Sequence, residues 1–142
     1  MKQLLKLTGC LAVAGLFVSC QSVQQEANYQ VIPLPQEIVV EQGVPFILKS
    51  GVKILYPEGN EKMQRNAKFL ADYLKTATGE DFTIEAGTEG KNVIILALGT
   101  ENENPEAYQL KVAGDGVTIT GSTEAGVFYG IQSLRKSLPI AV

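Results

Sequence analysis

The 142-residue chain has no histidine and no tryptophan, and both of its cysteines, Cys10 and Cys20, lie in the first 20 residues. The absence of histidine removes the commonest general base and the commonest zinc ligand. The absence of tryptophan removes the usual aromatic platform for stacking a sugar or a base, and leaves five Tyr and five Phe. Because the cysteines precede the globular part of the chain, a disulfide framework in that part is excluded.

Positive charge is also scarce. The formal net charge is −3, and without Lys2 and Lys6 the chain has 10 basic residues against 15 acidic ones. No basic stripe is available to displace counterions from phosphate, so nucleic-acid binding is not expected. The length suits one domain with its own hydrophobic core.

The N-terminal segment has the pattern of an export signal. Lys2 and Lys6 precede an apolar stretch over residues 7–18, which is too short to span a bilayer, since a spanning helix needs about 20 residues. Cys20 follows the small Ser19 and precedes a polar run, an arrangement that resembles a bacterial lipoprotein signal. That resemblance implies a signal peptide over 1–19, lipidation of Cys20 and a flexible tether over 20–28. An ordinary secretory signal with an incidental cysteine is the alternative.

Under the lipoprotein reading the protein is exported to the cell envelope. The lipid would then anchor it at the periplasmic or the outer-surface face of a membrane. The sequence Leu7-Thr8-Gly9-Cys10 also fits the letters of a lipidation motif, but it is rejected as the site because it has almost no hydrophobic region upstream.

The first part of the globular region predicts short strands. Pro33 and Pro35 favour extended backbone, and two apolar runs, 38–41 and 46–49, are separated by a turn signal at 42–45. A third run over 52–56 ends at Pro57. The pattern predicts a meander of short strands.

A first helix is predicted after this meander. Asn60 stands at an N-cap position and Gly79 at a C-cap position. Between them the apolar residues recur at helical spacing, at Met63, Ala67, Leu70, Ala71 and Leu74. Lys62, Arg65 and Lys68 lie on the opposite, solvated side, where a basic binding patch is the alternative reading.

The middle of the chain predicts further strands. Residues 82–85 alternate, 93–98 form a continuous apolar run typical of a central strand covered on both faces, and 107–120 form a hairpin with a turn at 114–116. The acidic residues of the intervening loop, Glu101, Glu103 and Glu106, lack the spacing of a calcium loop and are interpreted as solvated.

The last helix, predicted over 122–138 and ended by Pro139, carries two stripes. The apolar residues are Val127, Ile131, Leu134 and Leu138, and the small residues beside them are Gly126, Gly130, Ser133 and Ser137. A glycine within a helix costs about 1 kcal/mol relative to alanine, so two on one face indicate a close backbone approach to a sheet. Phe128 and Tyr129 lie on the shoulders of the polar face and indicate a further surface that covers this helix.

Four segments together resemble a known module: IPLPQEI, PEAYQL, GVTITG and AGVFYGIQSL. The region from Tyr29 to Pro139 is similar to the N-terminal non-catalytic domain of family 20 glycoside hydrolases, the β-N-acetylhexosaminidases. The resemblance implies an α+β fold, with a mixed, largely antiparallel sheet packed against two helices at about Asn60–Thr78 and Ser122–Leu138. Residues 140–142 would then begin the connection to a (β/α)₈ barrel.

In that family the barrel hydrolyses the substrate, using an adjacent Asp–Glu pair and the substrate's own acetamido group. No position of this chain matches that pair, since the one adjacent pair of acids, Glu80-Asp81, follows the capping glycine and is interpreted as a turn. The resemblance therefore implies an accessory domain that has no catalytic residue, cofactor or metal and is inactive alone. Its expected partners are the barrel and, through the parent enzyme, glycans with terminal β-linked N-acetylhexosamine.

Phe128, Tyr129 and Arg135 are the candidate contacts with the barrel. A free-standing lipoprotein that binds glycan or protein is the alternative function, and tyrosines such as Tyr29, Tyr56 and Tyr108 would serve it.

Overall fold

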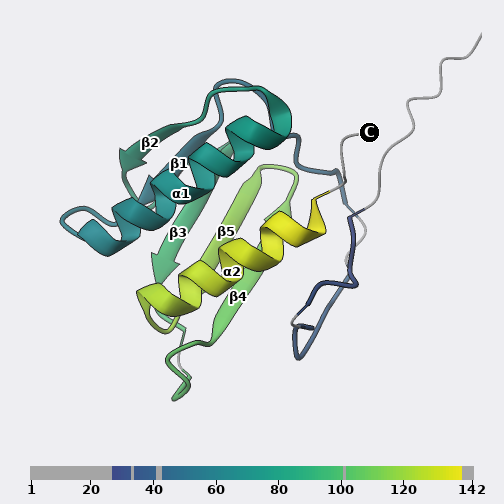
Figure 1. The fold of residues 1–142 in the computed structure, drawn as a ribbon, viewed down its shortest axis with the longest axis vertical. Coiled ribbons are helices and arrows are strands. Elements are labelled where there is room, and N and C mark those ends of the chain that lie inside the picture. The colour runs from purple at the N-terminus through teal and green to yellow at the C-terminus, as the bar shows by residue number, and fades with distance from the viewer. Residues whose placement is uncertain (1–26, 33, 41–42, 101, 139–142) are drawn as a thin grey trace, which may run out of the picture.

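The computed structural model describes residues 27–32, 34–40, 43–100 and 102–138. Five strands and two helices follow one another within these residues (Figure 1). In chain order they are β1 (Lys53–Tyr56), α1 (Glu61–Thr78), β2 (Thr83–Ala86), β3 (Val93–Leu98), β4 (Tyr108–Ala113), β5 (Gly116–Gly121) and α2 (Glu124–Ser137).

The strands form one mixed sheet in the order β2-β1-β3-β5-β4. The α+β class is confirmed, but the expectation of a largely antiparallel sheet is wrong. The β1–β2, β1–β3 and β3–β5 pairs are parallel, and only the β4–β5 hairpin is antiparallel. Parallel neighbours need a crossover connection, which α1 supplies between β1 and β2.

The sheet was expected to be largely antiparallel because a meander of short strands was predicted, and part of that meander does not form. Residues 38–40 and 46–49 are not strands in the structure, and Glu41 lies outside the described residues. Phe46 and Leu48 nevertheless pack against the core. Their apolar pattern therefore reflects packing onto the sheet and not membership of it.

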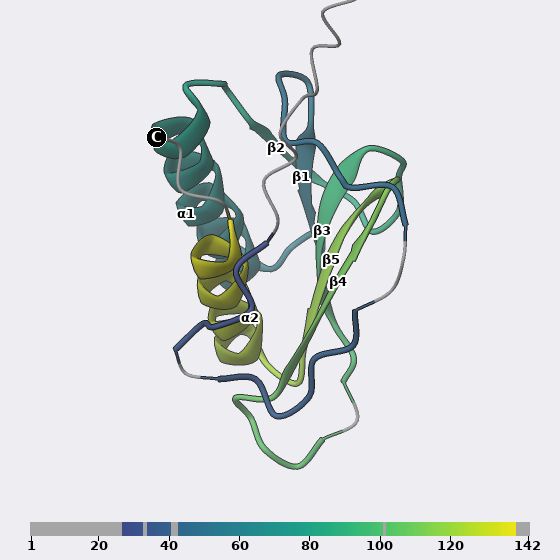
Figure 2. The ribbon, with the colours of Figure 1, turned by 90° about the vertical axis from the view of Figure 1, so that its right-hand side faces the viewer.

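Both helices cover the same face of the sheet and lie side by side (Figure 2). Ile54 of β1, Ile94 and Leu96 of β3 and Ile119 of β5 are fully buried beneath them. Strand β3 is the central strand, as expected, but its second face is only partly covered, because Val93 there is buried whereas Ile95 and Ala97 are partly exposed.

The α1 helix forms as its sequence predicts. The Asn60 side chain accepts a hydrogen bond from the Met63 backbone N–H at 3.0 Å, and Gly79 ends the helix in the left-handed conformation at φ 77°. All five residues of the predicted apolar stripe are buried. Lys62, Arg65 and Lys68 are exposed.

The α2 helix lies unusually close to the β4–β5 hairpin. A Cβ at Gly126 would collide with the Ala107 carbonyl oxygen, and one at Gly130 would collide with the Ile119 side chain. The two glycines are therefore required by close packing, which confirms the predicted close approach. Pro139, the predicted helix stop, lies outside the described residues.

The first described residues lie against the end of α2. The Asn28 backbone N–H donates to the Ser137 carbonyl oxygen at 2.9 Å, and the Lys136 ammonium donates to the Ile32 carbonyl oxygen. Val31 between them is buried. The expected signal peptide, most of the tether and residues 140–142 fall outside the described residues, and none of the helices that the structure describes is long and apolar enough to cross a membrane.

Candidate functional site on the outer face of the helix pair

The side of the helix pair that faces away from the sheet carries a cluster of aromatic side chains. Phe69 of α1 and Phe128 of α2 have ring centroids 5.3 Å apart, and Tyr129 meets the Phe128 ring edge-on at 6.1 Å. Phe69 and Tyr129 are exposed, at 37% and 39% of their surface. Because aromatic rings are normally covered in a folded domain, this cluster is a candidate contact surface.

Arg135 of α2 joins the same surface. Its guanidinium carbon lies 4.1 Å from the Tyr73 ring centroid and 5.0 Å from the Phe69 ring centroid, so both rings of α1 hold it by cation–π attraction. Its Nη1 donates to the Gln132 side-chain oxygen at 2.7 Å. The Tyr73 hydroxyl donates to the Arg135 carbonyl oxygen at 3.2 Å, which fixes the backbone beneath.

One guanidinium nitrogen has no hydrogen-bond partner. The Arg135 Nε is buried and donates to no acceptor among the described residues. Arg135 is therefore a planar cation held between two rings, half-buried, with one buried nitrogen that has no acceptor among the described residues.

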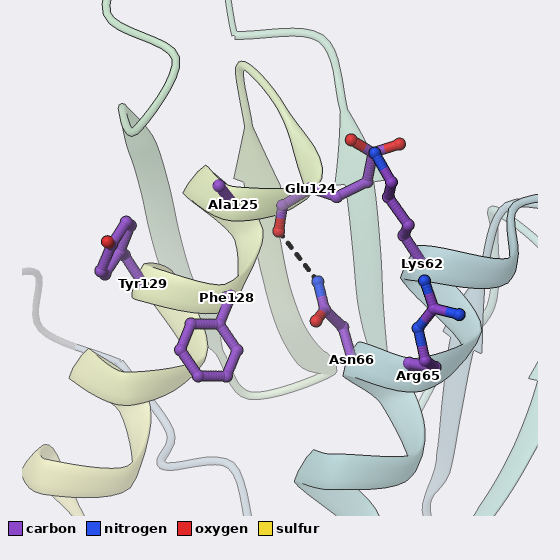
Figure 3. A pocket seen from close by; sticks show the side chains of 7 residues that line it. All are labelled: Lys62, Arg65, Asn66, Glu124, Ala125, Phe128 and Tyr129. Carbon is purple, nitrogen blue, oxygen red and sulfur yellow. Dashed lines mark hydrogen bonds between the residues drawn. The ribbon is translucent and has the colours of Figure 1, made fainter.

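A shallow pocket of about 280 Å³ lies beside the aromatic cluster, between the first turns of the two helices (Figure 3). Phe128 and Tyr129 come from α2, and Lys62, Arg65 and Asn66 come from α1 across the gap. The wall is thus aromatic on one side and cationic on the other.

Glu124 fixes the two helices to each other at the end of this pocket. Asn60 Nδ2 donates to its carboxylate at 3.1 Å, and Asn66 Nδ2 donates to its carbonyl oxygen at 2.9 Å. Its own backbone N–H, then Asn60 and the charge of Lys62, lower the pKa of the Glu124 carboxyl below its ordinary value. The carboxylate is therefore ionised at neutral pH and offsets part of the local positive charge.

The structure brings the three predicted contact residues, Phe128, Tyr129 and Arg135, onto one surface. It adds Phe69 and Tyr73, which the sequence reasoning missed. Their spacing of four residues places them on one face of α1 and was a usable signal. Cys20, the predicted lipidation site, lies outside the described residues.

Other residues considered as sites lie elsewhere. Glu80 and Asp81 are exposed, and Asp81 accepts a hydrogen bond from Lys75 at 2.5 Å, which raises the pKa of that lysine. Glu103 and Glu106 are exposed, whereas Glu101 is outside the described residues. Within residues 27–138, leaving aside the undescribed positions, no three His, Cys, Asp or Glu side chains gather as a metal site.

Tyr56 and Tyr108, two of the three tyrosines named for glycan binding, do not lie on neighbouring strands. Tyr56 ends β1 and Tyr108 begins β4, and two strands lie between these two in the sheet. The Tyr108 hydroxyl is hydrogen-bonded to the Ser133 hydroxyl at 2.5 Å beneath α2. Of the surfaces described, the outer face of the helix pair is the one with the exposed aromatic and arginine content typical of protein contacts.

Known proteins are similar to this chain in sequence and in fold. The profile of the family described as "Glycosyl hydrolase family 20, domain 2" matches residues 28–141. A curated β-hexosaminidase of Porphyromonas gingivalis is 30% identical over 142 residues, which cover 98% of this chain and 17% of that protein.

Two solved structures are similar in fold as well as in sequence. The β-N-acetylhexosaminidase of Streptomyces coelicolor matches 81% of this chain with 33% identity and a TM-score of 0.71, and the match covers 23% of that enzyme. The N-acetyl-β-hexosaminidase of Streptomyces plicatus matches 78% of the chain with 34% identity and a TM-score of 0.68, over 21% of its length. The chain thus spans about a fifth of the length of each relative.

Proposed function

The chain belongs to glycosyl hydrolase family 20 as its N-terminal, non-catalytic domain, and on that basis we propose that it is the accessory domain of an exported β-N-acetylhexosaminidase. The parent enzyme removes terminal β-linked N-acetylhexosamine from glycans. A (β/α)₈ barrel in the same polypeptide performs the hydrolysis, and the 142-residue chain has no activity alone.

The outer face of the helix pair carries this proposal. Phe69, Phe128 and Tyr129 form a contiguous aromatic surface on which Phe69 and Tyr129 are exposed and Phe128 is half-buried, with the Arg135 guanidinium over the Phe69 ring. We propose that the barrel packs on this surface. The accessory domain would then act by supporting the barrel through a hydrophobic contact with a polar rim.

The proposal extends to the cellular location. Cleavage before Cys20 and lipidation of that cysteine would place the enzyme in the cell envelope, joined to a membrane by its lipid and reaching glycans through the polar tether. Two sequence properties support export: the positive start of the chain and the short apolar stretch that follows it.

The size of the native product tests the proposal. An antibody against this domain should detect, in the source cell, a polypeptide several times heavier than 15.3 kDa that hydrolyses a chromogenic β-N-acetylglucosaminide. Palmitate labelling of that product should depend on Cys20. A native product near 15.3 kDa would overturn the accessory role.

The docking surface has its own test in that longer polypeptide. Phe128→Ala and Tyr129→Ala should lower the thermal stability of the domain within the full polypeptide more than within the 142-residue chain. Val112→Ala is the matched control, because Val112 is an exposed apolar residue on β4 and not on the helices. Equal effects in both backgrounds would show that the barrel does not cover this surface.

A further inference from the structure

Arg135 is held in place by neighbouring side chains but has no acidic partner among the described residues. The Tyr73 and Phe69 rings hold the guanidinium, and Gln132, the one described side chain that accepts a hydrogen bond from it, is neutral. The residue is half-buried, and its buried Nε has no acceptor among the described residues, which costs free energy that a hydrogen-bonding partner would recover. Stacking reduces the entropy that the side chain would lose on binding, so the guanidinium is preorganised for an acceptor.

Arg135 also has no salt-bridge partner among the described residues. Three ion pairs occur among the residues that the structure describes: Lys53–Glu85, Lys68–Asp72 and Lys75–Asp81. None of them includes Arg135 or Arg65, although the chain as a whole is acidic. Lys68 is paired with Asp72, and Glu124 lies within the charge influence of Lys62, so Arg135 and Arg65 supply the positive charge that remains for an acidic partner at this face.

We propose that Arg135 is the receptor for a carboxylate, the side chain of an Asp or Glu in the remainder of the same polypeptide. This inference rests on the proposed function and specifies the chemistry of its interface. The occupant is assigned to the same polypeptide because the matched relatives are about four to six times longer than their aligned portions. An ionised carboxylate matches the guanidinium in charge and can accept two hydrogen bonds from its fork of N–H groups.

The neighbouring aromatic side chains strengthen such a pair. Phe69 and Phe128 lie on the outer face with Arg135 and would be covered together with it, which excludes water from the contact. An Arg–carboxylate pair that is shielded from water in this way contributes more than one at an exposed rim. Arg135 would therefore fix the position of the partner and not merely add surface charge.

The test uses Arg135→Met and Arg135→Lys, each in the full polypeptide and in the 142-residue chain, with the domain's unfolding followed by scanning calorimetry. Arg135→Met should lower the unfolding midpoint by about 3 °C or more in the full polypeptide at pH 7, and by much less in the short chain. Arg135→Lys should recover only part of the loss, because ammonium keeps the charge but lacks the planar fork. Lys111→Met is the control, since it removes an exposed charge from β4.

Acidification identifies the partner as a carboxylate. The arginine lowers the pKa of its partner, so the pair's contribution is present above the ordinary carboxyl pKa and is lost as the pH falls below about 4. The difference between wild type and Arg135→Met in the full polypeptide should shrink over that range. A difference that is independent of pH would overturn the carboxylate assignment.

Failure of this inference can be told apart from failure of the proposed function. If Phe128→Ala acts only in the full polypeptide but Arg135→Met acts equally in both backgrounds, the barrel covers the face without pairing to Arg135, and the inference is wrong. If no longer polypeptide exists, the proposed function is wrong and this inference fails with it.

Discussion

Replacing Gly126 with alanine tests whether the close approach of α2 to the hairpin limits the stability of the fold. In an exposed helix this substitution stabilises by about 1 kcal/mol, because alanine loses less backbone entropy than glycine. In α2 the new Cβ would collide with the Ala107 carbonyl oxygen. That oxygen belongs to the backbone and accepts a hydrogen bond from the Ser122 N–H at 3.0 Å, so moving it would weaken this hydrogen bond.

The expected magnitude follows from three terms. Overpacking costs about 1–3 kcal/mol, and disturbing the Ser122 hydrogen bond costs about 1 kcal/mol. The higher helix propensity of alanine offsets about 1 kcal/mol of this loss in the free energy of unfolding. The Gly126→Ala variant should therefore unfold with a free energy about 1–3 kcal/mol below that of the wild type, opposite in sign to the effect of propensity alone.

Urea unfolding followed by far-UV circular dichroism measures this difference on the chain that begins at Gln21. Gly43→Ala is the matched control, because no atom lies within 4 Å of the added Cβ and the residue is exposed. Its effect should stay within about 0.5 kcal/mol. A Gly126→Ala variant as stable as the wild type, or more stable, would refute the argument that backbone contact requires this glycine.

Three further perturbations have definite expected outcomes. Tyr108→Phe should destabilise by about 1–2 kcal/mol, because it leaves the buried Ser133 hydroxyl without a partner, and adding Ser133→Ala should recover part of that loss in urea unfolding. Asn60→Ala should lower the free energy of unfolding by about 1–2 kcal/mol, because the N-cap of α1 is lost. The same variant should raise the pKa of Glu124, which lies below its ordinary value in the folded protein, and NMR titration measures that change. An unchanged Glu124 pKa would contradict the contact between the two side chains. Because that pKa is lowered on folding, Glu124 contributes stability above the ordinary carboxyl pKa that is lost as the pH falls through the folded value, and the Asn60→Ala variant should lose less on acidification. Asp81→Asn should change the unfolding free energy by less than about 1 kcal/mol, since its ion pair with a lysine is exposed.

Local features of the sequence predicted the helices well. The cap at Asn60, the ending at Gly79 and the buried stripe of α1 all depend on residues within a few turns of one another. The glycines of α2 were informative for a similar reason. Their cost in a helix is acceptable where another backbone lies close, as the hairpin does here.

The pairing of strands could not be predicted in the same way. Residues 46–49 have the composition of a strand, yet they only pack on the core, and the parallel pairing of β1 with both β2 and β3 depends on crossovers between distant segments. Only the α2 side of the outer face could be predicted, because the α1 side depends on the tertiary packing of the two helices. Phe128 and Arg135 follow from the pattern of α2, whereas the partnership of Phe69 with them depends on how the two helices are placed together.

The hydrogen bond between Asn28 and Ser137 places the two ends of the described fold next to each other. A polypeptide that runs into this fold therefore leaves it at almost the same point in space. The distance between the entry and exit points of the domain is therefore small compared with the size of the domain itself. Its gain or loss in a gene would change the composition of a protein while leaving the segments on either side close to their former separation.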